Sequence, residues 1–324
     1  MSKAVRFHAF GAPDVLRYED VTVDAPAPDE ARVRHAAIGL NFIDTYQRSG
    51  LYKVPLPAIA GTEAAGIVEA VGANVTHVKV GDRVAYAGGA PGAYCEVRNF
   101  TALRLCKLPD AISLEEAAAI TLKGMTVQYL IRRAYAVKAN ETVLFHAASG
   151  GVGLIACQWL KALGATVIGT AGSDDKCALA MQHGADYCIN YNSENFTQRV
   201  REITKGAGVP VVYDSVGKDT FLGSLDCLSP FGTLVSFGNA SGSVPAFEPS
   251  ILAQKGSLFI TRPMLTDYIA SNSDLQNAAA DLFSIVQSGK VKIEIKHRYA
   301  LKDAAQAHRD LEARKNTGSS ILIP

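Results

Sequence analysis

A glycine-rich turn is the feature whose residue types point most directly to chemistry. It reads Ala147-Ala-Ser-Gly-Gly-Val-Gly153, directly after an apolar stretch that ends at Phe145 and before an apolar helical pattern. Small residues let the backbone approach a pyrophosphate, and the N-terminus of the following helix offers amide donors and a partial positive charge. Strand, glycine turn and helix follow in the order that a dinucleotide site requires. The alternative is a plain strand-to-helix turn, which the repeated pattern described below makes the weaker interpretation.

The next apolar stretch bears on which dinucleotide is bound. NAD enzymes typically carry Asp or Glu at the end of the second strand, where it accepts from the ribose 2′-hydroxyl. Here the strand ends in Ala171-Gly172-Ser173, and Lys176 follows within one helical turn. Small residues, a hydroxyl and a cation suit a 2′-phosphate, although Lys176 alone could equally be an exposed helix lysine. Asp174 and Asp175 would favour the helix N-terminus through its dipole, but either could weaken phosphate binding.

These motifs belong to a repeated order of strand, turn and helix that begins near residue 124. Strands alternating with helices of this length require right-handed crossovers and a parallel sheet covered on both faces, which is a doubly wound α/β fold. We expect its strands at Thr142–Phe145, Thr166–Gly169, Tyr187–Asn190, Pro210–Tyr213, Thr233–Phe237 and Ser257–Thr261.

The first part of the chain has a different character. Short β-type runs separated by Pro and Gly predict a compact β-rich domain, followed by an alanine-rich helix at Glu115–Ile120. The predicted strands are Ala4–His8, Ala31–Ile38, Ala65–Val71 and Arg83–Ala87. After Arg262 we expect helices at Leu275–Gln287 and Leu301–Glu312 and a strand at Ser320–Ile323. The predicted domains are 1–123, 124–262 and a return of 263–324 to the first domain, with the active site in the cleft between the two domains.

Composition excludes several classes of function. Among 324 residues, 32 Lys and Arg balance 31 Asp and Glu, and no basic run occurs, so neither a nucleic acid nor an anionic membrane is an expected partner. No stretch approaches the roughly 18 apolar residues of a membrane-spanning helix, and the N-terminus does not read as a signal peptide. The six cysteines are scattered, which is typical of reduced thiols. We therefore expect a cytoplasmic enzyme.

The ordered motifs of the chain resemble those of the zinc-free, zeta-crystallin-like quinone oxidoreductases of the medium-chain dehydrogenase/reductase superfamily, and most of all the bacterial NADPH:quinone reductases. The resemblance covers essentially the whole chain. Its motifs are Gly11–Leu16, Gly39–Tyr52, Gly61–Gly66, Leu122–Thr126, Val212–Gly217, Val235–Asn239, Thr261–Pro263 and Gly318–Pro324. It implies a GroES-like catalytic domain, a Rossmann domain and a homodimer.

The resemblance also implies which residues would bind NADPH. The residues at the matching positions are Asn41, Thr126, Ser149, Gly150, Gly151, Val152, Gly172, Ser173, Lys176, Tyr191, Ser215, Phe237, Gly238 and Arg314. Ser173, Lys176, Tyr191 and Arg314 would form the phosphate pocket, since a guanidinium is a good phosphate partner. Arg314 could also be an ordinary cation at a helix C-terminus.

The zinc-dependent relatives of the resembled family offer a contrast. Their catalytic metal needs a Cys near position 41 and a His in a Gly-His-Glu motif, whereas this chain has Asn41 and Thr62 there. Neither is a good zinc ligand. We therefore expect no metal at this place and interpret Glu63, which cannot build a metal site alone, as structural.

Without a Lewis acid, an acceptor of hydride must be electrophilic in itself. A quinone meets this need, because the hydroquinone anion is aromatic and can be stabilised by hydrogen-bond donors. The segment from Asn41 to Tyr52 supplies donors in Asn41, Tyr46 and Tyr52, our predicted catalytic residues. Taken without the resemblance, Asp44 and Arg48 would be a surface pair and the tyrosines half-buried packing. Reduction of enones or enals and a non-enzymatic nucleotide- or RNA-binding role are the alternatives to quinone reduction.

Overall fold

The computed structural model describes residues 2–324, which divide into two compact units. One unit comprises 1–125, 268–287 and 293–324, and the other comprises 126–267 and 288–292. The predicted boundaries after residues 123 and 262 compare with observed boundaries after residues 125 and 267. Each unit is described in turn and is referred to as the catalytic-side unit and the nucleotide-side unit, respectively.

The nucleotide-side unit is built on a six-stranded parallel sheet in the order β11-β10-β9-β12-β13-β14. If the six strands are numbered from β9 to β14 along the chain, the order in the sheet is 3-2-1-4-5-6. This is the order of two mononucleotide-binding halves that lie side by side through the first strand of each half. All six strands predicted from the sequence are present. Their bounds are β9 Thr142–Phe145, β10 Thr166–Ala171, β11 Tyr187–Asn190, β12 Val209–Asp214, β13 Leu228–Ser236 and β14 Phe259–Thr261.

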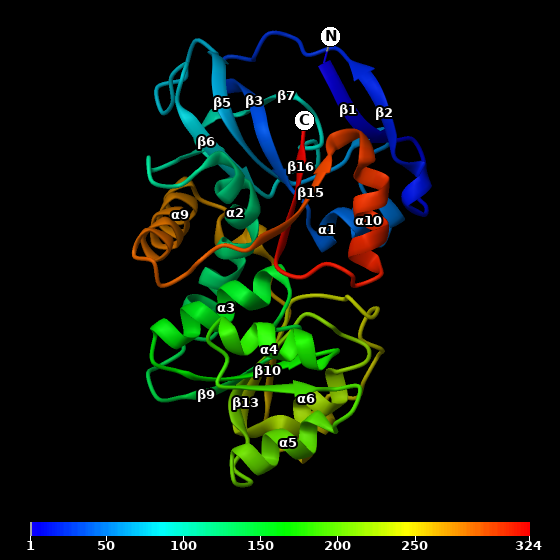
Figure 1. The fold of residues 1–324 in the computed structure, drawn as a ribbon, viewed down its shortest axis with the longest axis vertical. Coiled ribbons are helices and arrows are strands. Elements are labelled where there is room, and N and C mark those ends of the chain that lie inside the picture. Colours follow the sequence, from blue (N-terminus) through cyan, green and yellow to red (C-terminus); the bar gives the residue numbers. More distant parts are fainter. Residues whose placement is uncertain (1) are drawn as a thin grey trace. The chain divides into compact units, whose positions relative to one another are not determined.

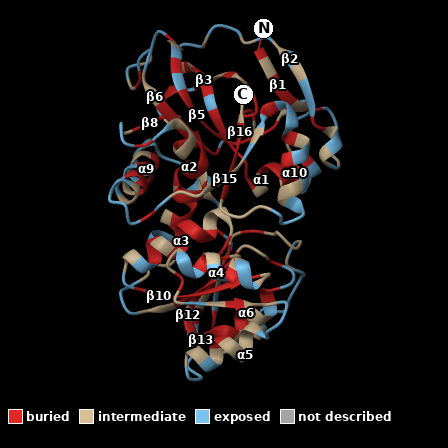
Figure 2. Cartoon of the chain, in the orientation of Figure 1, coloured by how far each residue is buried: buried red, intermediate tan, exposed pale blue. Residues whose placement is uncertain are grey.

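Helices cover both faces of this sheet. α3 and α4 lie together on one side of the strands and α5 and α6 together on the other (Figure 1). Along the central strands nearly every residue is buried, as Figure 2 shows, because the parallel sheet has no face exposed to solvent. The helices are α3 Gly151–Ala162, α4 Asp174–Gln182, α5 Phe196–Ile203, α6 Phe221–Cys227 and α7 Ser250–Gln254.

The catalytic-side unit is β-rich and contains two sheets. In the larger, strands run in the order β15-β16-β3-β5-β6-β8, with β7 also paired to β3, and the smaller has the order β2-β1-β4. The strands are β1 Ser2–Phe7, β2 Arg17–Val21, β3 Glu30–Gly39, β4 Ala58–Ile59, β5 Glu63–Val71, β6 Arg83–Ala87, β7 Val97–Thr101, β8 Cys106–Lys107, β15 Ile295–Ala300 and β16 Ser319–Ile323.

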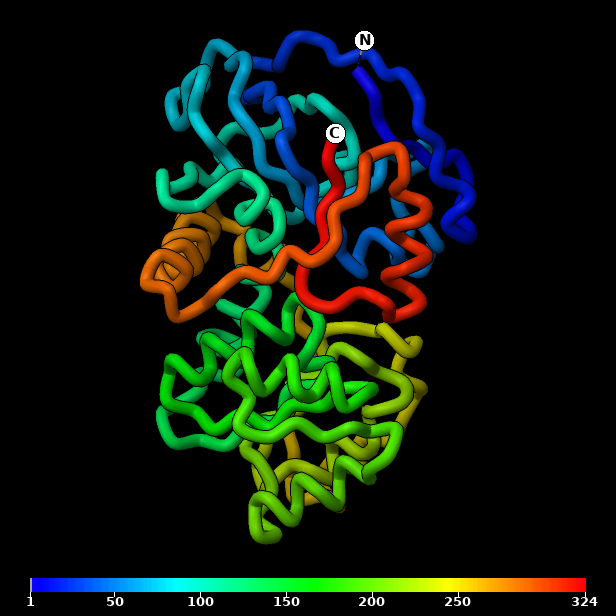
Figure 3. Tube along the Cα trace, viewed as in Figure 1, coloured from blue at the N-terminus to red at the C-terminus, as the bar shows by residue number. Residues whose placement is uncertain are grey.

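The end of the chain enters the larger sheet beside one of its first strands. β16 pairs antiparallel with β3 through Ile321 opposite Gly39, and it pairs parallel with β15. Figure 3 shows the terminal red segment beside the blue segment of β3. Strand β15 was not predicted from the sequence, because its residues, Ile-Lys-His-Arg-Tyr-Ala, are largely polar.

Helix α2 is longer than predicted, and a glycine explains the difference. The sequence predicts a helix at Glu115–Ile120, but α2 spans Leu114–Tyr129 and includes Gly124. A Cβ at Gly124 would lie 2.3 Å from Leu282 Cδ1, so the glycine permits close packing of α2 on α9 and does not end the helix. The other helices are α1 Phe42–Ser49, α8 Leu265–Tyr268, α9 Asn272–Gln287 and α10 Ala304–Glu312; short 3₁₀ turns lie at Pro13–Val15, Ala102–Arg104 and Leu301–Asp303, and a π-helical turn at Leu130–Ala134 follows α2.

No helix within residues 2–324 combines the length and the apolar character needed to cross a membrane.

Candidate functional site

The glycine-rich turn links β9 to α3, as the sequence predicts. Gly150 is the N-cap of α3 and has no side chain to occupy the first amides of the helix. Because the first N–H groups of a helix lack intrahelical acceptors, those of Gly151 and Val152 can donate to a phosphate. A Cβ at Gly153 would lie 2.4 Å from the Ala147 carbonyl oxygen, so this glycine is needed for the turn itself. The geometry of the turn is therefore compatible with a bound phosphate.

At the end of β10 the structure brings the predicted 2′-phosphate residues of this unit together. Ser173 is the N-cap of α4 and accepts from the Lys176 backbone N–H at 3.4 Å. A Cβ at Gly172 would lie 2.8 Å from the Tyr191 hydroxyl oxygen, so the missing side chain leaves room for that phenol. The Tyr191 backbone N–H donates to the Ala171 carbonyl at 3.1 Å. A hydroxyl and a phenol thus lie at a strand end whose last residues, Ala171 and Gly172, carry no carboxylate, and Lys176 lies in the first turn of the helix that follows.

The two aspartates that follow Ser173 differ in their surroundings. Asp174 accepts a hydrogen bond from Asn190 Nδ2 at 2.8 Å, at the end of the neighbouring strand β11. Both Asp174 and Asp175 are exposed in the first turn of α4, where the helix dipole favours an acid. The Asp174 carboxylate therefore has a structural partner of its own.

Three more predicted cofactor residues meet at the carboxyl ends of β12 and β13. A Cβ at Gly238 would lie 2.5 Å from the Ser215 carbonyl oxygen, so the two backbones are in close contact. The Phe237 N–H donates to the Asp214 carbonyl at 2.8 Å, and its ring packs 5.8 Å from that of Phe145. In α/β sheets of this type, ligands bind beyond the carboxyl ends of the strands.

The remaining cofactor candidates lie elsewhere. Ser149 is buried in the glycine-rich turn and Thr126 is buried in α2. Asn41 and Arg314 belong to the catalytic-side unit, where Arg314 is exposed directly after α10 with a left-handed backbone (φ 56°).

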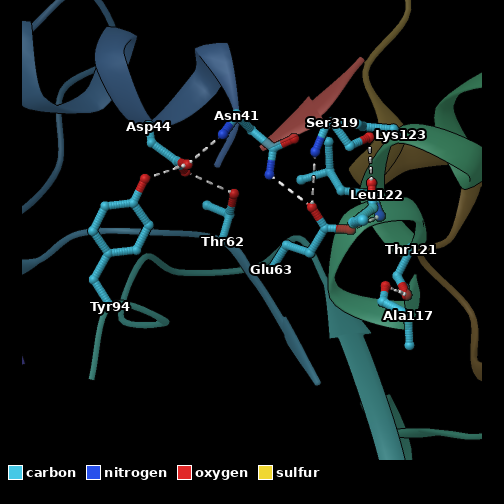
Figure 4. Close-up of polar contacts among 11 residues, drawn as sticks. Asn41, Asp44, Thr62, Glu63, Tyr94, Ala117, Thr121, Leu122, Lys123 and Ser319 are labelled. Atoms are coloured by element: carbon cyan, nitrogen blue, oxygen red, sulfur yellow. Dashed lines mark hydrogen bonds and ion pairs between the residues drawn. The ribbon is translucent and has the colours of Figure 1, made fainter. Parts of the chain in front are cut away.

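A buried polar cluster surrounds Asn41 in the catalytic-side unit (Figure 4). Asn41 is the N-cap of α1, and its backbone N–H donates to Asp44 Oδ2 at 2.9 Å. The Thr62 hydroxyl donates to Asp44 Oδ1 and the Tyr94 hydroxyl to Asp44 Oδ2, both at 3.0 Å. The Asp44 carboxylate therefore joins α1 to the residue that precedes β5 and to the loop before β7.

Asp44 and Arg48 are not a surface pair. Both are 1% exposed, and Arg48 pairs instead with Glu312 of α10. Burial raises the pKa of Asp44 to about 7, against the opposing effect of its three hydrogen-bond donors. Asp44 and Arg48 are four residues apart, and this spacing alone predicts a pair on the surface of a helix. The sequence does not show that α10 covers this side of α1.

Beyond Tyr94 the cluster ends in a buried histidine. The Tyr94 hydroxyl oxygen lies 3.1 Å from His308 Nε2, and the rings of Tyr94 and His308 stand edge to face. Burial, followed by the nearby Arg48 charge, lowers the pKa of His308 to about 3. His308 is thus held neutral at physiological pH.

The side chain of Asn41 points to a second carboxylate, that of Glu63. Asn41 Nδ2 donates to Glu63 Oε2 at 2.8 Å, and the Leu122 backbone N–H donates to Oε1 at 2.6 Å. Lys123 Nζ lies 3.5 Å from the same Oε2. Burial raises the pKa of Glu63, and the Lys123 charge is the main influence that lowers it. Sequence analysis gave Lys123 no role, although a lysine in an apolar helix is itself a signal of a buried charge.

The residues at this place do not fit a zinc ion. Asn41 and Thr62 stand where thiolate and imidazole would be needed, and an ammonium group is already paired with Glu63. Across residues 2–324, no group of three or more His, Cys, Asp or Glu side chains is arranged to hold a metal.

Tyr46 and Tyr52 lie together at the end of α1. Their rings are 5.4 Å apart at 68°, an edge-to-face contact, and both side chains are partly buried. The Tyr52 N–H donates to the Tyr46 carbonyl at 3.0 Å across a turn in which Gly50 has φ 84°. The left-handed glycine folds the chain back and so places the two phenols side by side.

Two family models match most of the chain. The alcohol dehydrogenase GroES-like domain matches residues 27–141, and the zinc-binding dehydrogenase model matches residues 151–283. Together with the β-rich unit and the doubly wound unit, these matches define a member of the medium-chain dehydrogenase/reductase superfamily.

Relatives similar over the whole chain define the family more closely. The chain is 55% identical over 325 residues to a quinone oxidoreductase of Pseudomonas aeruginosa, covering 100% of both chains. The crystal structure of Escherichia coli quinone oxidoreductase complexed with NADPH superposes with a TM-score of 0.98 at 53% identity, covering 99% of this chain and 100% of that one. A 2-haloacrylate reductase of Burkholderia is 42% identical, covering 100% of this chain and 99% of the relative. The chain belongs to the quinone oxidoreductase family.

Proposed function

We propose that this protein reduces quinones with NADPH, by hydride transfer that needs no metal. The observation that carries the proposal is the end of β10, where the strand has no terminal carboxylate, the Tyr191 hydroxyl lies beside Gly172, and Ser173 and Lys176 begin the next helix. This arrangement favours a 2′-phosphate over a free 2′-hydroxyl. The similarity to a quinone oxidoreductase solved with NADPH supports the same conclusion.

The cofactor would be held by the turn after β9, the end of β10 and the ends of β12 and β13. The first amides of α3 would bind the pyrophosphate, and Lys176 with Ser173 would bind the 2′-phosphate. When bound, NADPH supplies the hydride. The proposed contact residues are Asn41, Thr126, Ser149, Gly150, Gly151, Val152, Gly172, Ser173, Lys176, Tyr191, Ser215, Phe237, Gly238 and Arg314.

Asn41, Tyr46 and Tyr52 are the proposed catalytic residues. The paired phenol rings can stack on a planar acceptor, while their hydroxyls donate hydrogen bonds to its oxygens. Asn41 has one amide hydrogen committed to Glu63, so its second amide hydrogen would be the one that donates to a ligand.

The test is the rate of NADPH oxidation with matched series of quinones and activated enones. We expect kcat/KM to be higher for the quinones. The similarity to a 2-haloacrylate reductase favours enone reduction as the second candidate, and a higher kcat/KM for enones would select it. Absence of turnover with both series, despite tight nucleotide binding, would select a non-enzymatic nucleotide-binding role.

We also infer that the protein forms a homodimer. β14 is an edge strand of the six-stranded sheet, and Phe259 on it is 61% exposed. Phe231, two residues before the ladder partner of Phe259, is 70% exposed. An open edge beside exposed aromatic rings is a surface that a second copy can cover. Light scattering should give twice the mass of the chain, and Phe259→Lys should shift the mass toward that of one chain; a parent protein of single-chain mass at every concentration would refute the inference.

A cytoplasmic location is proposed on the basis of the thiols. None of the six cysteines, which all lie within residues 2–324, is in a disulfide, and five are buried. Free thiols of this kind are typical of reducing compartments. Cell fractionation with an antibody against the chain tests the location.

A further inference from the structure

The buried ammonium group of Lys123 has no hydrogen-bond acceptor within residues 2–324. Lys123 lies on α2 and is 5% exposed. Among residues 2–324, its one charged neighbour at pairing distance is Glu63, whose Oε2 is 3.5 Å from Nζ, the outer limit of a hydrogen bond. An ammonium group has three donors, and burying them unsatisfied is unfavourable.

Glu63 is already engaged by two shorter contacts. Its Oε1 accepts from the Leu122 N–H at 2.6 Å, and its Oε2 accepts from Asn41 Nδ2 at 2.8 Å, which is shorter than its distance to Lys123. Glu63 therefore balances the charge of Lys123 but, as a single group at 3.5 Å, does not satisfy all three of its donors. Figure 4 shows Asn41, Glu63 and Lys123 gathered at one place from α1, β5 and α2.

We propose that Lys123 is a catalytic residue, whose ammonium donates a hydrogen bond to the oxygen of the reducible substrate that becomes negatively charged. The proposal rests on the proposed function. In that reaction the quinone accepts a hydride (two electrons and a proton) from NADPH, whose C–H bond breaks to leave NADP⁺, and a proton from solvent completes the hydroquinone. The oxygen is an anion before it is protonated, and a preorganised cation in a buried site stabilises that charge strongly.

A purely structural role for Lys123 makes a different prediction from a catalytic one. If the lysine only neutralises Glu63, then removing both charges together should restore both stability and activity. If the ammonium acts on the substrate, removing both charges should restore stability alone, since a buried charge is destabilising when its partner is lost.

The kinetic experiment uses Lys123→Met, Lys123→Arg, Glu63→Gln and the double variant Lys123→Met/Glu63→Gln. Lys302→Met, which removes an exposed lysine of the same unit, is the matched control. We expect kcat/KM of the double variant to fall by about tenfold to a hundredfold. The loss should be greatest for quinones of low electron affinity, because they need more stabilisation of the developing anion. If Lys123→Met does not fold, the double variant gives the result.

A binding experiment tests the same contact without turnover. para-Nitrophenol in the presence of NADP⁺ mimics the hydroquinone anion, and its absorbance distinguishes phenolate from phenol. The parent protein and Lys302→Met should bind the phenolate form more tightly than the phenol form, and both Lys123→Met and the double variant should lose this preference. The dissociation constant of NADPH should stay within about twofold of the parent value in the double variant.

Three results would overturn the role of Lys123. A folded double variant with the parent kcat/KM would make the pair structural, and a parent protein without preference for phenolate would remove the anion contact. A large loss of NADPH affinity with unchanged turnover at saturation would assign the ammonium to the nucleotide. Failure of the proposed function is a separate result. In that case no quinone would support oxidation of NADPH by the parent protein.

Discussion

Lys176 shows how the role of one side chain depends on the atoms that its neighbours lack. Lys176 lies in the first turn of α4, and the residue before the N-cap of this helix is Gly172. The Tyr191 hydroxyl takes the space that a side chain at Gly172 would fill. An Asp or Glu at the end of β10 would repel a phosphate at this place. The proposed preference for NADPH would therefore be a property of the whole strand end, with the lysine as its charged component.

Replacing Lys176 with Ala should weaken NADPH binding and leave NADH binding unchanged. A charge-assisted hydrogen bond to the 2′-phosphate would be lost, at a cost of about 1–3 kcal/mol. Fluorescence titration with both nucleotides measures the effect, with Lys290→Ala, an exposed lysine of the same unit, as the control. Equal dissociation constants of NADPH and NADH for the parent protein would contradict the interpretation of this site.

The two phenols at the end of α1 should contribute modestly to catalysis. Hydroquinone anions need little help to be protonated, and a phenol of ordinary pKa, near 10, can donate at neutral pH. We expect Tyr46→Phe and Tyr52→Phe each to lower kcat/KM for a small benzoquinone by about tenfold, or about 1.4 kcal/mol. Tyr18→Phe, at an exposed position of the same unit, should have no effect. If both variants match the parent, the tyrosines are packing residues.

At the scale of elements, α1 is fixed at both ends by buried polar side chains. Asp44 in its first turn accepts from Thr62 and Tyr94, and Arg48 in its last turn pairs with Glu312 of α10. Asn41 and Tyr46 are therefore carried by a helix that cannot shift without breaking buried polar contacts, which is costly. This rigidity explains why a short helix of eight residues can position a site.

The pKa of Asp44 predicts a pH dependence of stability. The pKa of Asp44 is 3.8 in the unfolded chain and about 7 in the folded chain. Between pH 3.8 and about pH 7, the unfolded chain has therefore released a proton that the folded chain retains. The stabilisation is thus complete below 3.8 and is lost as the pH rises to about 7, so the free energy of unfolding falls over this range. Asp44→Asn should be less stable than the parent, because its amide nitrogen would face donors, but should lack this component of the slope. Denaturant unfolding across the range measures it.

The control for this comparison is Asp267→Asn, at an exposed position. It should keep the slope of the parent. A slope of Asp44→Asn equal to that of the parent would show that the Asp44 carboxyl is ionised in the folded protein throughout the range.

Local sequence patterns predicted the nucleotide-side unit better than the catalytic-side unit. The inner strands β9, β10 and β12 are largely apolar and buried, and glycines mark the turn between β9 and α3, so this order of elements could be predicted. The cluster around Asn41 could not, because Tyr94, Lys123 and His308 reach it from distant parts of the chain. Periodicity describes which side of an element is apolar but does not identify the element that will cover a polar residue.

At the scale of the whole molecule, the chain builds its catalytic-side unit from both of its ends. β16 completes the sheet beside β3, and the Ser319 hydroxyl donates to the Ala119 carbonyl of α2 at 3.0 Å. The strand that precedes Asn41 and the helix that carries Lys123 are thus both contacted by the last residues of the chain. The C-terminal segment therefore contacts both of the elements that carry the polar cluster.

Metal independence is a prediction for the complete protein, since it concerns every possible ligand set. Thiolate and imidazole are replaced by Asn41 and Thr62, and the Glu63 carboxylate is used by an amide, a backbone N–H and an ammonium. A dication placed there would be repelled by Lys123, so added zinc should not raise the rate. Purified protein should contain far less than one zinc per chain by elemental analysis and should keep its quinone reductase activity after prolonged chelation. One zinc per chain, with turnover lost in chelator and recovered on adding zinc, would show that a ligand set other than the one around Glu63 serves the reaction.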